Sequence, residues 1–210
     1  MVLVGSWESE ILSTPSAQLW IPPHQAGMPV VEGLFEQTIE GSEGMFVGSK
    51  PARFSQELER EIVDRCWLLA SLYQHLGYIG RCSFDMILVG KNFQDCRLEF
   101  IECNGRWGGA SAPMTLMNRM FGDWISQPYA AGECCVEGLN RITFAELLEC
   151  VRSDLYDVRT GQGSIIFYNP GRMPIQSGIN ILSIANTWEE AAEIIDVTFP
   201  QKLQQILIKR

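Results

Sequence analysis

Apolar and polar positions alternate in short segments over the first 50 residues, a pattern typical of strands rather than helices. Proline and glycine residues lie between these segments and mark turns. We expect an antiparallel meander in which Gln18, Glu32 and Glu36 lie mainly on a solvated face. Its strands are predicted at residues 11–21 with an interruption at Pro15, at 30–39 and at 45–48, with turns at 25–29 and 41–44.

One long amphipathic helix follows the meander. Ser55 is a good N-cap residue, and Gly77 is a typical residue at which a helix ends. Apolar residues recur between them at helical spacing, and we expect this stripe to face the core. The stripe consists of Leu58, Ile62, Leu69, Leu72 and Leu76.

A hairpin is predicted after this helix, with strands at 83–89 and 97–103 joined by the turn Gly90-Lys91-Asn92. Side chains on a strand alternate between its two faces, so Leu98, Phe100 and Glu102 should share one face. Asn104 continues that face, and pairing of the two strands can set Asp85 beside Glu102.

The second half of the chain mixes helices with a further hairpin. We expect a short helix at 114–121, a loop at 122–140, and helices that begin at the capping boxes Thr143/Glu146 and Thr187/Glu190. The first of these helices should extend to about residue 156, and the second should break or restart at Pro200. A hairpin of 165–168 with 179–184 lies between them. The predicted fold class is α+β, mainly an antiparallel sheet backed by helices.

Three oxygen-donor side chains converge if the first hairpin forms as predicted: Asp85, Glu102 and Asn104. Carboxylate and amide oxygens are ligands that Mg²⁺ prefers in proteins. Arg106 follows two residues later and offers a guanidinium for a phosphoryl oxygen, and Gly108-Gly109 allows close approach of the backbone to a ligand. A single acidic residue at a strand end is usually just solvated, so the prediction depends on the combination.

This combination resembles the C-terminal core of the ATP-grasp superfamily, in which a strand with Asp is followed by a second strand and E-x-N-x-R. The resemblance extends to the pheganomycin-type peptide ligases and covers most of the chain in the family's order. It rests on the segments TPSAQLWIPP (14–23), FVGSKPA (46–52), GYIGRCSFD (77–85), IECNGRWGGASAP (101–113) and the later SIIFYNPGRMPIQSGINILSIANTWEEA. Around the ligands this chain departs from the close relatives in having Cys103, Gly105 and Trp107.

The resemblance implies an ATP- and Mg²⁺-dependent ligase that joins a small-molecule carboxylate to an amine or peptide through an acyl phosphate. Asp85, Glu102 and Asn104 would then hold Mg²⁺, and Arg106 would stabilise the transferring phosphoryl group as a catalytic residue. Arg81 would assist it or, alternatively, form a structural salt bridge. The loop from Gly108 and Gly109 to Ser111 would face phosphate or carboxylate, and Ile87 and Leu98 would contact the adenine.

The resemblance also implies a second lobe, which clamps the nucleotide in ATP-grasp enzymes and supplies a lysine to its phosphates. Here the likeness starts almost at residue 1, inside the C-terminal lobe. We expect residues 1–125 to form the catalytic lobe and 126–210 an extension packed on the same core. Three possibilities remain open at this stage: the C-terminal half of a ligase, a subunit that needs the other lobe from a partner chain, or a non-catalytic binding or assembly module.

Composition narrows the function classes further. The formal net charge of −9 argues against a nucleic-acid partner, because contacts to phosphates need clustered Lys and Arg. No apolar run is long enough for a membrane helix, and residues 1–10 do not resemble a signal peptide. Seven cysteines, without a C-x-x-C pair, are typical of small buried residues in a reducing compartment, so we expect a cytoplasmic protein. With two histidines, a zinc site is not expected.

Overall fold

The computed structural model describes residues 8–40 and 45–208, and these fall into two compact units. Unit 1 comprises Met1–Thr38 and Pro51–Ser111, and unit 2 comprises Ile39–Lys50 and Ala112–Arg210. The chain therefore passes between the units three times. The predicted division into 1–125 and 126–210 differs from this, because residues 39–50 and 112–125 group with unit 2. Each unit has a hydrophobic cluster of its own rather than a share of one core. The turn predicted at 41–44 lies outside the described residues.

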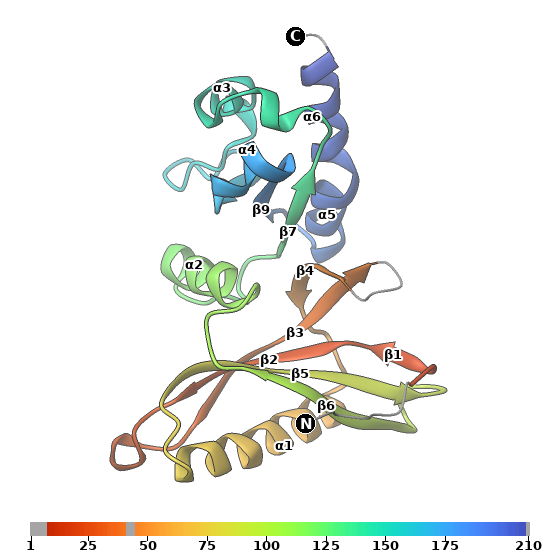
Figure 1. Cartoon of the computed structure of the whole chain (residues 1–210), viewed down its shortest axis with the longest axis vertical. Coiled ribbons are helices and arrows are strands. Elements are labelled where there is room, and N and C mark those ends of the chain that lie inside the picture. The colour runs from red at the N-terminus through yellow and green to blue at the C-terminus, as the bar shows by residue number, and fades with distance from the viewer. Residues whose placement is uncertain (1–7, 41–44, 209–210) are drawn as a thin grey trace. The chain divides into compact units, whose positions relative to one another are not determined.

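Unit 1 is an antiparallel sheet covered on one face by a long helix (Figure 1). Its central strand β5 pairs with β2 and β1 along one edge and with β6 along the other, and β2 also pairs with β3. The interruption predicted near Pro15 is confirmed, since it separates β1 from β2. The strands are β1 (Ile11–Ser13), β2 (Pro15–Ile21), β3 (Val30–Glu40), β5 (Gly80–Gly90) and β6 (Cys96–Asn104), and a short 3₁₀ turn η1 (His24–Ala26) joins β2 to β3.

Helix α1 (Gln56–His75) begins and ends at the predicted residues. The Oγ of Ser55 accepts a hydrogen bond from the Leu58 N–H, and Gly77 adopts a positive φ of 93° just after the helix. Its inner face packs on β2 and β5 around a closed core. The buried residues of this core include Ala17, Leu19, Ile21, Ile62, Cys66, Ala70, Cys82, Phe84, Met86, Leu88 and Leu98.

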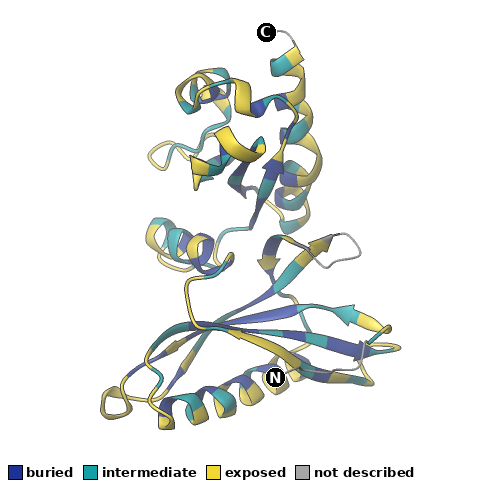
Figure 2. Cartoon of the chain, in the orientation of Figure 1, coloured by how far each residue is buried: buried dark blue, intermediate teal, exposed yellow. Residues whose placement is uncertain are grey.

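The predicted apolar stripe of α1 is only partly correct. Leu58 and Ile62 are buried, but Leu72 and Leu76 are exposed, so their assignment to the core is wrong. Ile62, Cys66 and Ala70 continue the buried row instead, at a spacing of four residues. Because one turn of an α-helix takes slightly fewer than four residues, a row with this spacing moves gradually around the helix, and the inward-facing positions change along its length. Figure 2 shows the resulting division of α1 into a buried side and an exposed side.

Unit 2 contains a second antiparallel arrangement in the order β4-β7-β9-β8. The predicted hairpin of β8 with β9 is confirmed. The predicted loop at 122–140 is wrong, because its central part is a buried strand. That segment, YAAGECC, consists mostly of small residues, and it lacks the β-branched side chains that indicate a strand in sequence. The strands are β4 (Met45–Pro51), β7 (Tyr129–Cys135), β8 (Ile165–Tyr168) and β9 (Gly178–Ile184).

The predicted helices of unit 2 are present, with different bounds in two cases: the helix predicted at 114–121 begins earlier, at Ser111, and the helix predicted to extend to about residue 156 ends earlier. Thr143 and Glu146 form a complete capping box, yet the helix ends at Cys150, and the Thr187 hydroxyl caps the helix that follows it. Pro200 lies in the first turn of α6, directly after a π-helical turn at Ile194–Thr198. The helices are α2 (Ser111–Phe121), α3 (Phe144–Cys150), α4 (Met173–Gln176), α5 (Trp188–Glu193) and α6 (Phe199–Ile208), with 3₁₀ turns η2 (Leu139–Arg141), η3 (Arg152–Asp154) and η4 (Pro170–Arg172).

Among the described residues, no helix is long and apolar enough to cross a membrane. The α+β fold class with a mainly antiparallel sheet is confirmed.

We predict that removing the Ile62 side chain destabilises the chain strongly, because it leaves a cavity between α1 and the sheet. Ile62→Ala should lower the free energy of unfolding by about 2–5 kcal/mol, measured by urea denaturation followed by circular dichroism. The matched control is Ile175→Ala, the same deletion at a side chain that is 79% exposed, which should change it by less than ~0.5 kcal/mol. Equal effects of the two substitutions would contradict the packing described for α1.

Candidate metal and phosphate site

The pairing of β5 with β6 brings the three predicted oxygen donors together. Asp85 lies opposite Glu102, and Ser83 lies opposite Asn104. The Nδ2 of Asn104 donates hydrogen bonds to Asp85 Oδ2 at 2.8 Å and to Glu102 Oε1 at 2.5 Å. Two carboxylates from neighbouring strands therefore converge on one amide group, on the face of the sheet opposite α1, where Glu102 is exposed and Asp85 is half-buried.

A β-bulge in β6 produces this convergence. Asp85 pairs with Glu102 but the next residue, Met86, pairs with Phe100, so Ile101 is an extra residue in β6. The insertion moves Glu102 to the opposite face from Leu98 and Phe100, and the prediction that these three share a face is wrong. Phe100 instead packs edge-on against Phe84, at a ring-centroid distance of 6.0 Å.

The bulge also separates the two apolar residues that were expected at the adenine. Leu98 is opposite Leu88 and belongs to the core under α1, with 7% of its surface exposed. It therefore lies on the other face of the sheet from Asp85. Ile87 is half-buried, two residues along β5 from Asp85, and so lies on the same face as that carboxylate.

A chain of hydrogen bonds connects Asp85 to the glycine-rich loop. Ser16 Oγ donates to Asp85 Oδ1 at 2.7 Å, and Gln18 Nε2 donates to Ser16 Oγ at 3.3 Å. Ser111 Oγ in turn donates to Gln18 Oε1 at 2.6 Å and accepts from the Gly108 N–H at 3.0 Å. Every polar group in this series of hydrogen bonds lies within unit 1, so the sheet itself fixes the position of the loop relative to the carboxylates.

Gln18 and Ser16 are the residues that sequence reasoning missed. Gln18 is 1% exposed, although we expected it mainly on a solvated face, and Ser111 is fully buried. The signal was present in the pattern P-S-A-Q-L, where two polar residues two apart lie on one face of an otherwise apolar strand. A buried amide on such a strand requires hydrogen-bond partners, and here they come from two distant segments.

The glycine-rich loop lies where β6 leads into α2. Gly109 is exposed and Gly108 is half-buried, so backbone is accessible there. The Ser111 hydroxyl, which was expected to face a ligand, is used instead to hold Gln18 and the Gly108 N–H.

The two candidate arginines differ in their surroundings. Arg81 forms two hydrogen bonds with the carboxylate of Glu32, and its guanidinium lies 4.7 Å from the centre of the Trp107 ring. The structural salt bridge, which the sequence analysis gave as the alternative role of Arg81, is therefore present, and it neutralises much of the charge of Arg81. Arg106 is exposed and donates to the Trp107 carbonyl at 3.4 Å, so its guanidinium lies at the surface beside the loop.

Cysteine side chains near the carboxylates face the helix side of the sheet. Cys82 belongs to the core, and burial raises the pKa of its thiol to about 12. Burial also raises the pKa of the Cys103 thiol, which adjoins Tyr73 of α1. Both thiols are therefore neutral at pH 7 and do not act as thiolate ligands. Among the described residues, no group of three or more His, Cys, Asp or Glu side chains is arranged to hold a metal, so the candidate site depends on the amide of Asn104.

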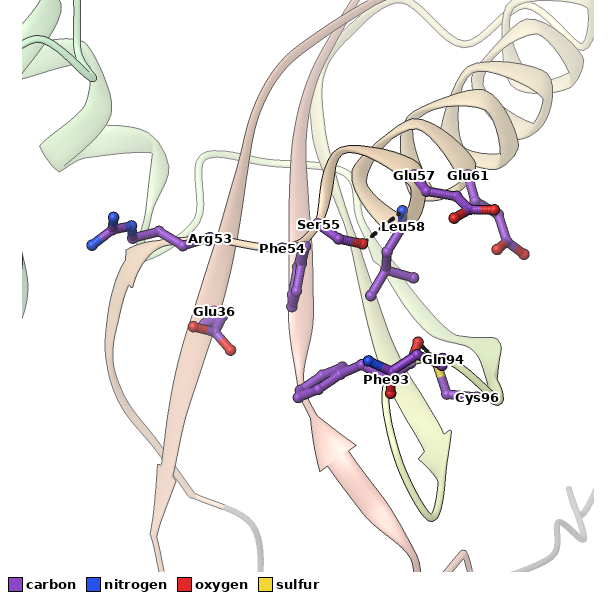
Figure 3. Close-up of a pocket in the computed structure, with 10 residues that line it drawn as sticks. All are labelled: Glu36, Arg53, Phe54, Ser55, Glu57, Leu58, Glu61, Phe93, Gln94 and Cys96. Carbon is purple, nitrogen blue, oxygen red and sulfur yellow. Dashed lines mark hydrogen bonds between the residues drawn. The ribbon is translucent and has the colours of Figure 1, made fainter.

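A cavity of about 550 Å³ lies elsewhere in unit 1, where α1 begins and β5 turns into β6 (Figure 3). The rings of Phe54 and Phe93 line it, with Glu57 and Glu61 at its rim. Glu36 also lines it, on the same face as Leu34 and hence on the helix side of the sheet. None of the predicted site residues lies in this cavity, which is therefore distinct from the cluster of carboxylates.

Comparisons with known proteins give structural matches alone. No protein family profile and no curated protein sequence matches the chain. Its structure is similar to that of the purK N5-carboxyaminoimidazole ribonucleotide synthetase in its ADP complex, with a TM-score of 0.62, 11% identity and coverage of 94% of this chain and 51% of that chain.

Two further structures show the same likeness. The N5-carboxyaminoimidazole synthase of Aspergillus clavatus has a TM-score of 0.59, 14% identity and coverage of 95% and 53%. An L-amino acid ligase from Bacillus licheniformis has a TM-score of 0.54, 16% identity and coverage of 92% and 52%. The chain has an ATP-grasp fold. It spans about half the length of these proteins, corresponding to their C-terminal part.

We predict that Gln18 and Ser111 are energetically coupled, because removing either side chain leaves a buried polar group of the other without its hydrogen-bond partner. Gln18→Met and Ser111→Ala should each cost about 1–3 kcal/mol of folding free energy. A double-mutant cycle in urea should give a coupling of about 0.5–3 kcal/mol. As a control, Ser183→Ala removes another fully buried hydroxyl, in unit 2, and should add to Gln18→Met within about 0.5 kcal/mol. If the effects of Gln18→Met and Ser111→Ala simply add, the proposed coupling through their hydrogen bond is excluded.

Proposed function

We propose that the face of the unit 1 sheet opposite α1 is, around Asp85 and Glu102, the Mg²⁺ and phosphate side of an ATP-dependent carboxylate–amine ligase. The observation that carries this proposal is the clustering of Asp85, Glu102 and Asn104, in which one amide contacts both carboxylates. Support also comes from the fold, which is shared with a structure described as an ADP complex and with an L-amino acid ligase. The more specific resemblance to pheganomycin-type peptide ligases stays a prediction.

The donor set fits Mg²⁺. With the Asn104 amide turned so that its oxygen faces the carboxylates, two carboxylates and one amide oxygen match the one or two carboxylates that Mg²⁺ usually takes from a protein, with water and phosphate oxygens as its other ligands. Asn104 now uses its amide nitrogen to bridge two negative groups, and a divalent cation would compensate them more fully. When bound, Mg²⁺ would neutralise charge on the phosphates of ATP during phosphoryl transfer.

The residues around the carboxylates have complementary roles in this proposal. Ser16 and Gln18 orient Asp85, and the same chain of hydrogen bonds holds Gly108 beside it. Exposed backbone at Gly109 approaches phosphate, and the accessible guanidinium of Arg106 compensates charge on the transferring group. Arg81, held by Glu32 and Trp107, orients the loop. Ile87 remains the apolar contact proposed for the adenine, and Leu98 is no longer included because it lies in the core.

The proposed reaction has two steps. An oxygen of the substrate carboxylate attacks the γ-phosphorus of ATP, which forms an acyl phosphate and releases ADP. The amine of the second substrate then attacks the acyl carbon, and inorganic phosphate leaves as the amide bond forms. The acid and the amine are small molecules or peptides in this proposal. Because similar structures are about twice as long, we propose that a second lobe, on another segment or another chain, completes the nucleotide clamp.

The metal assignment can be tested without turnover. Glu102→Gln removes one of two carboxylate charges at nearly constant shape, and it should weaken Mn²⁺ binding by about tenfold or more in an electron paramagnetic resonance titration. Glu57→Gln makes the same change at an exposed residue on the rim of the other cavity and should leave the affinity unchanged. Equal affinities of Glu102→Gln and the unsubstituted chain would refute the assignment.

Nucleotide binding by the 210-residue chain should be weak, since one lobe offers contacts to only one side of ATP. We expect a Kd for ATP above about 1 µM in calorimetry with Mg²⁺ present. Submicromolar affinity would show that no second lobe is needed. Metal binding without ATP-dependent phosphate release, even after a complementary lobe is added, would favour a non-catalytic module.

A further inference from the structure

The outward face of α1 carries a row of exposed leucines. Leu68, Leu72 and Leu76 are spaced four residues apart and are 69%, 54% and 72% exposed. Trp67 on the same helix and Ile79, three residues after Leu76, are exposed as well. We call these five residues the leucine face. Single exposed leucines are ordinary, but a contiguous row of large apolar side chains on one helix usually marks a contact surface.

The leucine face is not needed by the core of unit 1. The inner face of α1 is already filled by Leu58, Ile62, Cys66 and Ala70. Gln74 closes this inner face near the end of the helix by donating to the carbonyls of Pro22 and Gly27, at 2.8 Å each. The exposed row therefore lies on the side of α1 opposite this inner face. Figure 2 shows that the exposed side of α1 faces away from the sheet.

We propose that the leucine face binds a second copy of this chain, with the two α1 helices antiparallel about a two-fold axis near Leu72. In this arrangement Leu68 of each copy faces Leu76 of the other, so the same patch is used on both sides. The exposed fractions correspond to roughly 600 Å² of apolar surface per copy and about 1,200 Å² for the pair, the lower limit for a specific interface.

The distribution of charge along α1 favours the antiparallel direction. Acidic residues are concentrated in the first half of the helix, whereas the segment from Trp67 to Ile79 contains no Asp, Glu, Lys or Arg. Parallel pairing would place the acidic halves side by side, and antiparallel pairing separates them and opposes the helix dipoles. The acidic residues are Glu57, Glu59, Glu61 and Asp64.

The same charges argue against a lipid surface as the occupant. Helices that lie in a membrane interface usually carry Lys and Arg on their polar face, which attract anionic lipids. Helix α1 has four acidic and two basic residues before Trp67, and the chain has a net charge of −9. Anionic lipids would therefore repel this helix. A second copy brings neutral apolar surface against neutral apolar surface, so no such repulsion arises at the contact.

The test uses sedimentation equilibrium of the 210-residue chain, which should show a monomer–dimer equilibrium. Leu68→Lys and Leu76→Glu should each raise the dimer dissociation constant by more than about tenfold, because each places a charge against an apolar partner. The variant with both substitutions should recover most of this loss, since the introduced ammonium of one copy then meets the introduced carboxylate of the other. A parallel dimer would bring like charges together and would show no recovery.

Controls separate this result from other causes. Ile175→Glu adds a charge at a similarly exposed apolar residue of unit 2 and should leave the dissociation constant unchanged. Circular dichroism should be the same for all variants, because the substituted side chains lie outside the core. A chain that is monomeric up to about 100 µM, or a double variant as weak as its worse single, overturns the proposal. Binding of the chain to anionic vesicles in place of dimerisation, abolished by Leu68→Lys, overturns it as well.

Discussion

Two carboxylates lie opposite each other on neighbouring strands of unit 1, and they repel unless other groups compensate their charge. Asp85 and Glu102 are held together by the Asn104 amide, which donates to both. A like-charged pair of this kind destabilises a sheet unless a donor or a cation compensates it. The bulge at Ile101 adjoins this pair, the Ser16 hydroxyl donates to Asp85, and the buried amide of Gln18 donates to that hydroxyl. Such a costly arrangement on an accessible face is typical of a functional site.

Sequence reasoning predicted that Asp85, Glu102 and Asn104 lie close together, but it did not predict their full geometry. The turn at Gly90 and the alternation of β5 set Asp85 opposite the second strand, and these features depend on local chemistry alone. Register in β6 depends on one inserted residue, Ile101. The only sign of this insertion in the sequence is that two apolar residues, Phe100 and Ile101, are adjacent. For this reason the face of Glu102 was assigned correctly relative to Asp85 but incorrectly relative to Leu98. The partners of Gln18 were out of reach because they come from distant parts of the chain.

The same limit explains the other differences. Strand β7 consists largely of small residues, whose strand conformation is imposed by β4 and β9 on either side rather than by propensity. In α1, periodicity identified a helix but did not decide which leucines face inward, since apolar residues occur on both of its sides. Threonine N-caps were the most dependable signals, because their hydrogen bonds join residues only three apart, although Thr143 alone forms the complete capping box.

The hydrogen-bond chain through Gln18 also constrains the order in which the protein folds. Ser16 and Asp85 are 69 residues apart in sequence, and Gln18 and Ser111 are 93 apart. Contacts of such long range carry a large loop-closure entropy and form slowly compared with helices and hairpins. The β5–β6 hairpin can therefore assemble early with its carboxylates unsupported, and the geometry around them becomes fixed only in the last stages of folding. The proposed ion affinity would then emerge with the completed tertiary structure and would report on its integrity.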